Sequence, residues 1–143
     1  MSDTFRLRLP RFRLGPEIEV AVNSLWQDFV TDATAEIDSA PTDSFDWYPG
    51  LVKKLESYAA NPILEARVAA YVLAKQNLGP NVIPADRARD RAEDLSGLLI
   101  VIVQDFQEAF GEPSSVEEAR SFLQNLVSMV AAATAQFLAT VAT

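Results

Sequence analysis

The residues with the clearest potential for chemistry are four carboxylates in one short stretch: Asp86, Asp90, Glu93 and Asp94. The three aspartates recur every four residues, so on a helix they line one face, and Glu93 lies beside them. Carboxylate oxygens are the ligands that Mg²⁺ and Ca²⁺ prefer. One hypothesis is therefore a metal-dependent hydrolase that uses these carboxylates on a helical bundle.

A second interpretation of the same stretch competes with a metal site, and we favour it. Arginines alternate with the acids at spacings that suit ion pairs along an exposed helix. The pairs expected from this spacing are Arg89 with Glu93, Arg87 with Asp90, and Arg91 with Asp94. We therefore predict a solvated, charged helix face, and we assign no metal or cofactor.

The composition excludes most catalytic machinery. The chain of 143 residues contains neither histidine nor cysteine. It therefore lacks the commonest general base, the commonest metal ligand and any thiol nucleophile. It also has no glycine-rich phosphate loop and no Ser-x-x-Lys motif. We assign no catalytic residue and expect a protein that is not an enzyme.

Charge is divided unevenly along the chain. Residues 1–14 carry four arginines and one acid, a net charge of +3, whereas the remaining residues carry eight basic and nineteen acidic side chains, a net charge of −11. An acidic body repels a nucleic-acid backbone, so nucleic-acid binding is not expected except through the N-terminal residues. A third hypothesis follows from the same charge, an inhibitor that offers its acidic body to a basic site.

The basic N-terminal residues form an arm in which arginines alternate with apolar residues. The alternating set comprises Phe5, Arg6, Leu7, Arg8, Leu9, Arg11, Phe12, Arg13 and Leu14. A period of two is typical of an extended segment and not of a helix. Arginine suits bidentate pairing with carboxylates. We expect the arm to bind a partner, which is the acidic surface of the same or a neighbouring protomer, or else phosphates or lipid; the alternative is a frayed, solvated terminus. The expected partner-binding residues are Arg6, Arg8, Arg11, Arg13, Phe5 and Phe12.

Proline and glycine divide the rest of the chain into five helical segments. The expected helices run over residues 16–37, 49–60, 62–77, 84–111 and from 116 to the end of the chain. Asn61 is expected to cap the third, Gly79 to end it, and Ser114 or Ser115 to cap the fifth through a capping box. The aromatic loop before the second helix is expected to fold onto the core. The sequence thus predicts an all-α fold, a five-helix and mostly antiparallel bundle over residues 16–143, with an extended arm over residues 1–15.

The fourth helix contains the most apolar stretch of the chain. Residues 98–103 read Leu-Leu-Ile-Val-Ile-Val and are apolar on every side of a helix. This pattern predicts a central helix surrounded by the others, and Gly97 is expected to let a neighbouring backbone approach closely.

The last helix has no charged side chain from residue 121 onward. One side is apolar, and the other consists of small and amide side chains. An exposed helix usually shows Glu and Lys, so this side is either the outer side of a core helix that happens to lack charge or a subunit contact. The predicted self-association residues are Gln124, Asn125, Ser128, Ala132, Gln136 and Thr140. The helix is long enough to cross a membrane, but its polar side argues against a span.

These patterns favour binding over catalysis. The leading hypothesis is a non-enzymatic assembly or adaptor subunit that self-associates or docks in a larger complex through its last helix and its arm. Arginines interrupt any secretory pattern at the N-terminus, so we expect a cytoplasmic location or one within an assembled particle.

Overall fold

The computed structural model describes residues 5–76 and 85–141. Within them the chain is all helical, with five helices and no strand, as the sequence predicted. The helices are α1 (Pro16–Ser39), α2 (Tyr48–Ala59), α3 (Pro62–Gln76), α4 (Ala85–Phe110) and α5 (Val116–Val141). Each helix begins and ends within two residues of its predicted bounds where those bounds lie in the described residues.

The helix starts follow from local side-chain chemistry. Asn61 Oδ1 accepts a hydrogen bond from the Ile63 N–H (2.7 Å), which caps α3. Ser115 Oγ accepts from the Glu118 N–H (3.1 Å), and the Glu118 carboxylate accepts from the Ser114 N–H (3.0 Å). This is a capping box whose return bond reaches one residue further back than usual. The predicted caps of α3 and α5 are confirmed, whereas Gly79 lies outside the described residues.

Two glycines with positive φ mark sharp changes of chain direction. Gly15 (φ 103°) precedes α1, and Gly111 (φ 66°) follows α4. The Gly111 N–H donates to the Gln107 carbonyl (2.8 Å), a helix-ending bond that needs the left-handed conformation glycine tolerates. The short connection that follows leads directly into α5.

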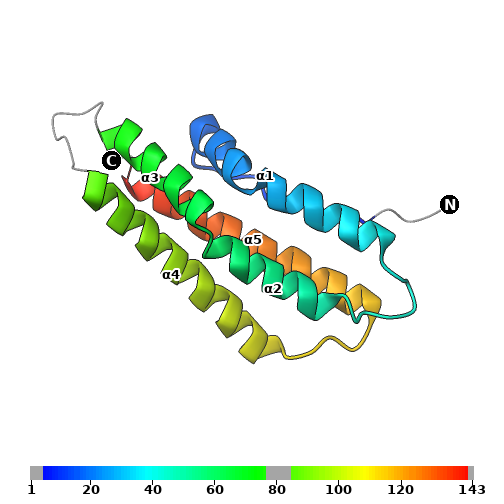
Figure 1. Ribbon diagram of the computed structural model, residues 1–143. Helices are drawn as coiled ribbons and strands as arrows, with labels where there is room; N and C mark the ends of the chain where they lie inside the picture. The colour runs from blue at the N-terminus through cyan, green and yellow to red at the C-terminus, as the bar shows by residue number, and fades with distance from the viewer. Residues whose placement is uncertain (1–4, 77–84, 142–143) are drawn as a thin grey trace.

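The helices pack along one another as a bundle (Figure 1). In Figure 1, α2 and α3 follow each other almost in line, because only Ala60 and Asn61 separate them. α5 contacts each of the other four helices, whereas the main contacts of α4 are with α2, α3 and α5. α5 rather than α4 therefore has the most neighbours.

The prediction of a central fourth helix was wrong. Leu98 and Val101, in its most apolar stretch, are 47% and 49% exposed. Gly97 is also exposed, and no atom lies within 4 Å of the position that a Cβ would take there. The reason is that α4 packs only one side against its neighbours, the side that carries Leu95, Leu99 and Val103.

The core is one continuous apolar cluster that all five helices share. Trp26 of α1 lies at its centre, fully buried, and its indole Nε1 donates to Thr134 Oγ1 of α5 (3.1 Å). Thr134 is the one buried polar residue among the described residues, and its hydroxyl donates in turn to the Val130 carbonyl (2.8 Å). The loop before α2 folds onto this core as predicted, with Phe45 and Trp47 packed against it.

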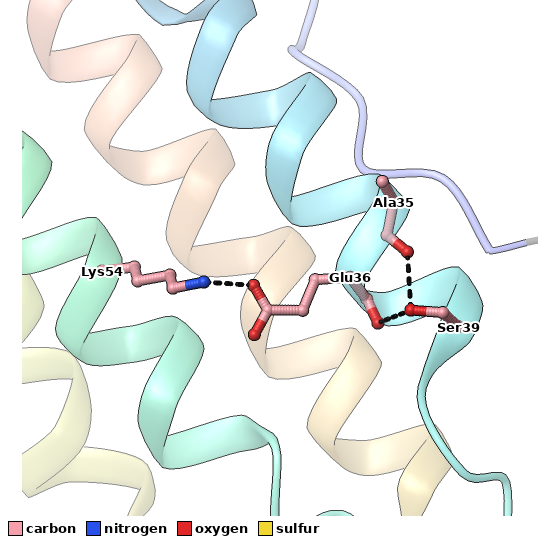
Figure 2. A network of polar contacts seen from close by, with 4 residues as sticks. All are labelled: Ala35, Glu36, Ser39 and Lys54. Carbon is pink, nitrogen blue, oxygen red and sulfur yellow. Dashed lines mark hydrogen bonds and ion pairs between the residues drawn. The ribbon is translucent and has the colours of Figure 1, made fainter.

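Polar contacts also join helices at the surface, as Figure 2 shows for α1 and α2. Lys54 of α2 is hydrogen bonded and ion paired to Glu36 of α1 (2.5 Å), and Ser39 donates to carbonyls of the last turn of α1. Both partners of the ion pair are substantially exposed, so solvent screens their attraction and its effect on stability is small.

One helix is long and apolar enough to cross a membrane by length and composition, the stretch Val116–Thr140 in α5. In the structure 44% of the relevant window is buried inside the bundle. Core helices of bundles pass the same test, so the finding by itself decides nothing about a membrane.

Candidate interaction surface

Residues 5–14 lie on the bundle with their arginines outward and with their apolar side chains, except Leu14, inward. Leu7 is buried (4% exposed), and Phe5, Leu9 and Phe12 are partly buried against the core. The outward side chains are Arg6, Arg8, Arg11 and Arg13, all exposed. The alternation in the sequence therefore corresponds to two sides of one segment, one facing protein and the other facing solvent.

The backbone of this N-terminal segment is held by side chains of two helices. Gln124 of α5 accepts from the Arg8 N–H (3.0 Å) and donates to the Arg8 carbonyl (2.6 Å). Thr34 of α1 accepts from the Leu7 N–H (3.2 Å). The segment thus lies along α1 and α5 and pairs with both through its main chain.

An aromatic contact anchors the start of the segment. The guanidinium of Arg120 lies over the Phe5 ring, 5.4 Å from its centroid, a favourable cation–π geometry. Arg120 Nε is buried and has no hydrogen-bond partner in the structure. The Phe5 ring is therefore part of the environment that compensates for burial of the Arg120 side chain.

The distance that the segment covers shows that it is close to fully extended. Leu7 bonds to Thr34, which is eighteen residues into α1 from Pro16, a rise of about 27 Å. Only nine residue steps connect Leu7 to Pro16, and a fully extended chain of that length spans about 30 Å. The segment must therefore run back along α1 from Gly15 with almost no slack.

Six exposed residues form an uncharged stripe along α5. They are Ser121, Asn125, Met129, Ala132, Gln136 and Thr140, spaced three or four residues apart so that they share one side of the helix. We call this set the α5 stripe. Four of the six predicted self-association residues belong to it: Asn125, Ala132, Gln136 and Thr140.

The other two predicted self-association residues are partly buried and are engaged inside the chain. Gln124 holds the backbone of Arg8, and its Nε2 also lies 3.5 Å from Ser128 Oγ. Gln124 and Ser128 lie on the flank of α5 that the N-terminal segment covers. These two residues therefore contact the same chain and not a second subunit.

Sequence reasoning missed the apolar part of this surface. Met129, Leu98 and Val101 are 45%, 47% and 49% exposed. Leu98 and Val101 were expected to lie inside a surrounded helix, because hydrophobic spacing shows which residues can be buried but not how many neighbours a helix has. The one available signal was an excess of apolar residues on α4 beyond what a single buried side requires.

The four candidate metal ligands in the first half of α4 are exposed and are not brought together. Asp86, Asp90, Glu93 and Asp94 are all exposed. In the described ranges no three acidic side chains are grouped closely enough to hold a metal ion. The three expected arginine–acid pairs also fail to come within 4.0 Å, so the stretch is a solvated charged face without those ion pairs.

The best-formed hollow lies between the loop before α2 and the end of α4. It has a volume of about 420 Å³, and its lining includes Tyr48, Gln107, Asp46 and Glu112. Tyr48 Oη donates to Gln107 Oε1 (3.0 Å), and burial raises the pKa of the Tyr48 hydroxyl. A tyrosine with a raised pKa is a weaker acid, so the Tyr48 hydroxyl stays protonated over a wider range of pH.

Comparison with protein-family models, with curated proteins and with solved structures finds no match for this chain.

Proposed function

We propose that this chain is a non-enzymatic assembly or adaptor subunit that self-associates through the α5 stripe. In this proposal residues 16–143 form one mostly antiparallel helical bundle, and residues 1–15 are an extended arm. The short connection between α4 and α5 and the course of the N-terminal segment along α1 support that arrangement. The predicted location, cytoplasmic or within an assembled particle, stays a prediction.

The observation that carries the proposal is the α5 stripe. A helix side exposed to water usually carries Glu and Lys, whereas this one carries amides, hydroxyls, alanine and an exposed methionine. Exposed Leu98 and Val101 on α4 add apolar surface. Exposed apolar surface of this kind is typical of a protein contact.

The uncharged α5 stripe allows a second copy to be the partner. The chain has a net charge of −8, so two copies repel each other wherever their acidic surfaces meet. A contact that places the α5 stripes together buries no charged side chain of α5, because α5 carries none from residue 121 onward. Small side chains also let two helices approach closely, and amides can bond across the contact.

The proposal accounts for the hydropathy of α5 without a membrane. Its most apolar residues, including Leu123, Leu126 and Leu138, are at most 1% exposed inside the bundle. Insertion into a bilayer would remove α5 from contacts with all four other helices. We therefore propose a core helix with one side in a protein interface.

The first test is the mass of the protein in solution. Light scattering after size exclusion at micromolar concentration should give a mass well above 15.7 kDa for the full chain. Deleting residues 1–14 should lower that mass or weaken association. A monomer that is unchanged by the deletion contradicts the proposal.

A point substitution tests whether the α5 stripe, and not another part of the surface, forms the contact between copies. Ala132→Glu places a charge in the middle of the α5 stripe and should shift the protein toward monomer. Ala70→Glu makes the same change on an exposed position of α3 and should leave the mass unchanged. Far-ultraviolet circular dichroism checks that both variants keep their helices. Equal masses for the two variants would remove the α5 stripe from the interface.

A further inference from the structure

The α5 stripe lies between a row of arginines and an acidic helix edge. On one flank of α5, Gln124 holds Arg8 of the N-terminal segment. On the opposite flank, Phe122 packs against Phe106 and Phe110 of α4, with ring centroids 5.8 and 5.6 Å apart. Figure 1 shows α1 and α4 on either side of α5, which agrees with these contacts. We call the exposed arginines of the N-terminal segment, Arg6, Arg8, Arg11 and Arg13, the arginine row. Across this face the arginine row comes first, the α5 stripe lies in the middle, and α4 lies on the other side.

The edge of α4 beside the α5 stripe is apolar in the middle and acidic at both ends. Asp94, Leu98, Val101 and Asp105 are all exposed and follow a 4-3-4 spacing, so they share one side of α4. Leu98 is on the same i+4 ridge as Phe106, two turns away, and that ridge leads to α5. The acidic edge and the arginine row therefore flank the same uncharged stripe.

The arginine row and the acidic edge also match in level and length. Arg8 is at the level of Gln124 on α5, and Asp105 is next to Phe106, which contacts Phe122. From Arg8 to Arg13 an extended chain advances about 17 Å. From Asp105 to Asp94 a helix rises by about 16 Å. The path from Arg8 to Arg13 and the path from Asp105 to Asp94 both run toward the C-terminal end of α5. Arg13 and Asp94 are therefore at about the same level along α5.

We propose that two copies of this chain pair about a two-fold axis parallel to α5, so that the arginine row of each copy lies on the acidic α4 edge of the other. This proposal rests on the proposed self-association through the α5 stripe and specifies its symmetry. A rotation about that axis brings the α5 stripes together and exchanges the two flanks. Arg8 then faces Asp105 of the second copy, and Arg13 faces Asp94.

Charge selects this axis over the alternative. A two-fold axis in the same face but perpendicular to α5 also brings the α5 stripes together, but it places arginine row against arginine row and acidic edge against acidic edge. Like charges in apposition disfavour that arrangement, and opposite charges favour the proposed one. Arginine is well suited to the contact because its planar guanidinium binds a carboxylate through two parallel hydrogen bonds.

The experiment exchanges charges between the two flanks. Arg8→Glu and Asp105→Arg each create two like-charge contacts per symmetric pair, so each variant alone should dissociate at a concentration at least about tenfold higher than the parent chain. When the two variants are mixed, a pair with one copy of each has opposite charges in both contacts. The mixture should therefore regain the parent's mass by analytical ultracentrifugation, which no rescue within one chain can produce.

Controls make each outcome decisive. Asp32→Arg is an exposed charge reversal on α1, beside Lys54 and away from the α5 stripe, and on its own it should associate as the parent chain does. Melting curves establish that every variant is folded. A parent chain that is monomeric overturns both proposals. A parent chain that associates, with no weakening by Arg8→Glu or no recovery on mixing, overturns the two-fold pairing and leaves self-association standing.

Discussion

The side-chain amide of Gln124 is hydrogen bonded to both backbone groups of Arg8, although the two residues are 116 positions apart in the chain. The amide takes the place that a neighbouring strand would have, accepting from the N–H and donating to the carbonyl. An extended segment without a sheet partner thus has part of its backbone hydrogen bonding satisfied by one side chain.

This pairing predicts the effect of removing the amide. Gln124→Ala deletes both hydrogen bonds at a partly exposed site, and we expect the segment to open more often, at a cost of about 1 kcal/mol. Trypsin should then cut after Arg8 and Arg11 several times faster, as mass spectrometry of timed digests can measure. Gln104→Ala, which removes an exposed amide on α4 away from the segment, is the control. Equal digestion of the two variants would falsify the anchoring role of Gln124.

The buried link between Trp26 and Thr134 predicts a larger loss. Thr134→Val keeps the shape of the side chain but removes the acceptor of the indole N–H, so a buried donor is left unpaired at a cost of about 1–3 kcal/mol. Urea unfolding measures the free energy. In a Trp26→Phe background the same change should cost much less, because the donor is gone. If Thr134→Val costs the same unfolding free energy in the parent chain and in the Trp26→Phe background, the hydrogen bond contributes nothing to stability.

The ion pair between Glu17 and Lys75 predicts a pH dependence. The two side chains are 2.8 Å apart, and the hydrogen bond and charge of Lys75 lower the pKa of Glu17, while the hydrogen bond to Glu17 raises the pKa of Lys75. Stability from the carboxylate is lost as pH falls through its lowered pKa. Stability from the ammonium is lost as pH rises through its raised pKa.

Glu17→Gln should therefore lower the melting temperature slightly at neutral pH and have less effect toward acid and toward strong alkali. The effect is small because the Glu17 side chain is 79% exposed. Glu19→Gln, in the same first turn, controls for the helix dipole. A difference between the two variants that does not change with pH contradicts the assignment.

The cap of α5 predicts a difference between two adjacent serines. Ser115→Ala removes the acceptor of the Glu118 N–H and should cost about 1 kcal/mol of unfolding free energy. At Ser114 only the backbone N–H takes part in the cap, so Ser114→Ala should change the unfolding free energy little. Thermal unfolding of both variants measures the difference, and similar losses would show that the capping geometry has been misassigned.

The helices were predictable because proline, glycine and capping residues act locally. Pro16, Pro62 and Gly111 act on the backbone within a few residues of themselves. A short stretch of sequence therefore determines where each helix begins or ends. The alternation of residues 5–14 likewise indicated an extended segment, since such a segment repeats every two residues.

The packing of α4 and the use of Gln124 could not be predicted in the same way. The apolar run at residues 98–103 fits a surrounded helix and a one-sided helix equally well, and the number of neighbours is a property of the whole bundle. Backbone pairing by Gln124 leaves no pattern in the residue it binds, because every residue except proline offers the same N–H and carbonyl. The site residues on the α5 stripe were predictable only as one side of a helix without charge.

The path of the N-terminal segment also orders the events of folding. Residues 5–14 leave the ribosome before α1, yet Gln124, which holds them, is made more than a hundred residues later. The part of its binding site that α5 provides is complete only when α5 has been synthesised and has packed against α1. Its docking is therefore a late step in maturation, and until then its aromatic residues and four arginines are open to chaperones and proteases.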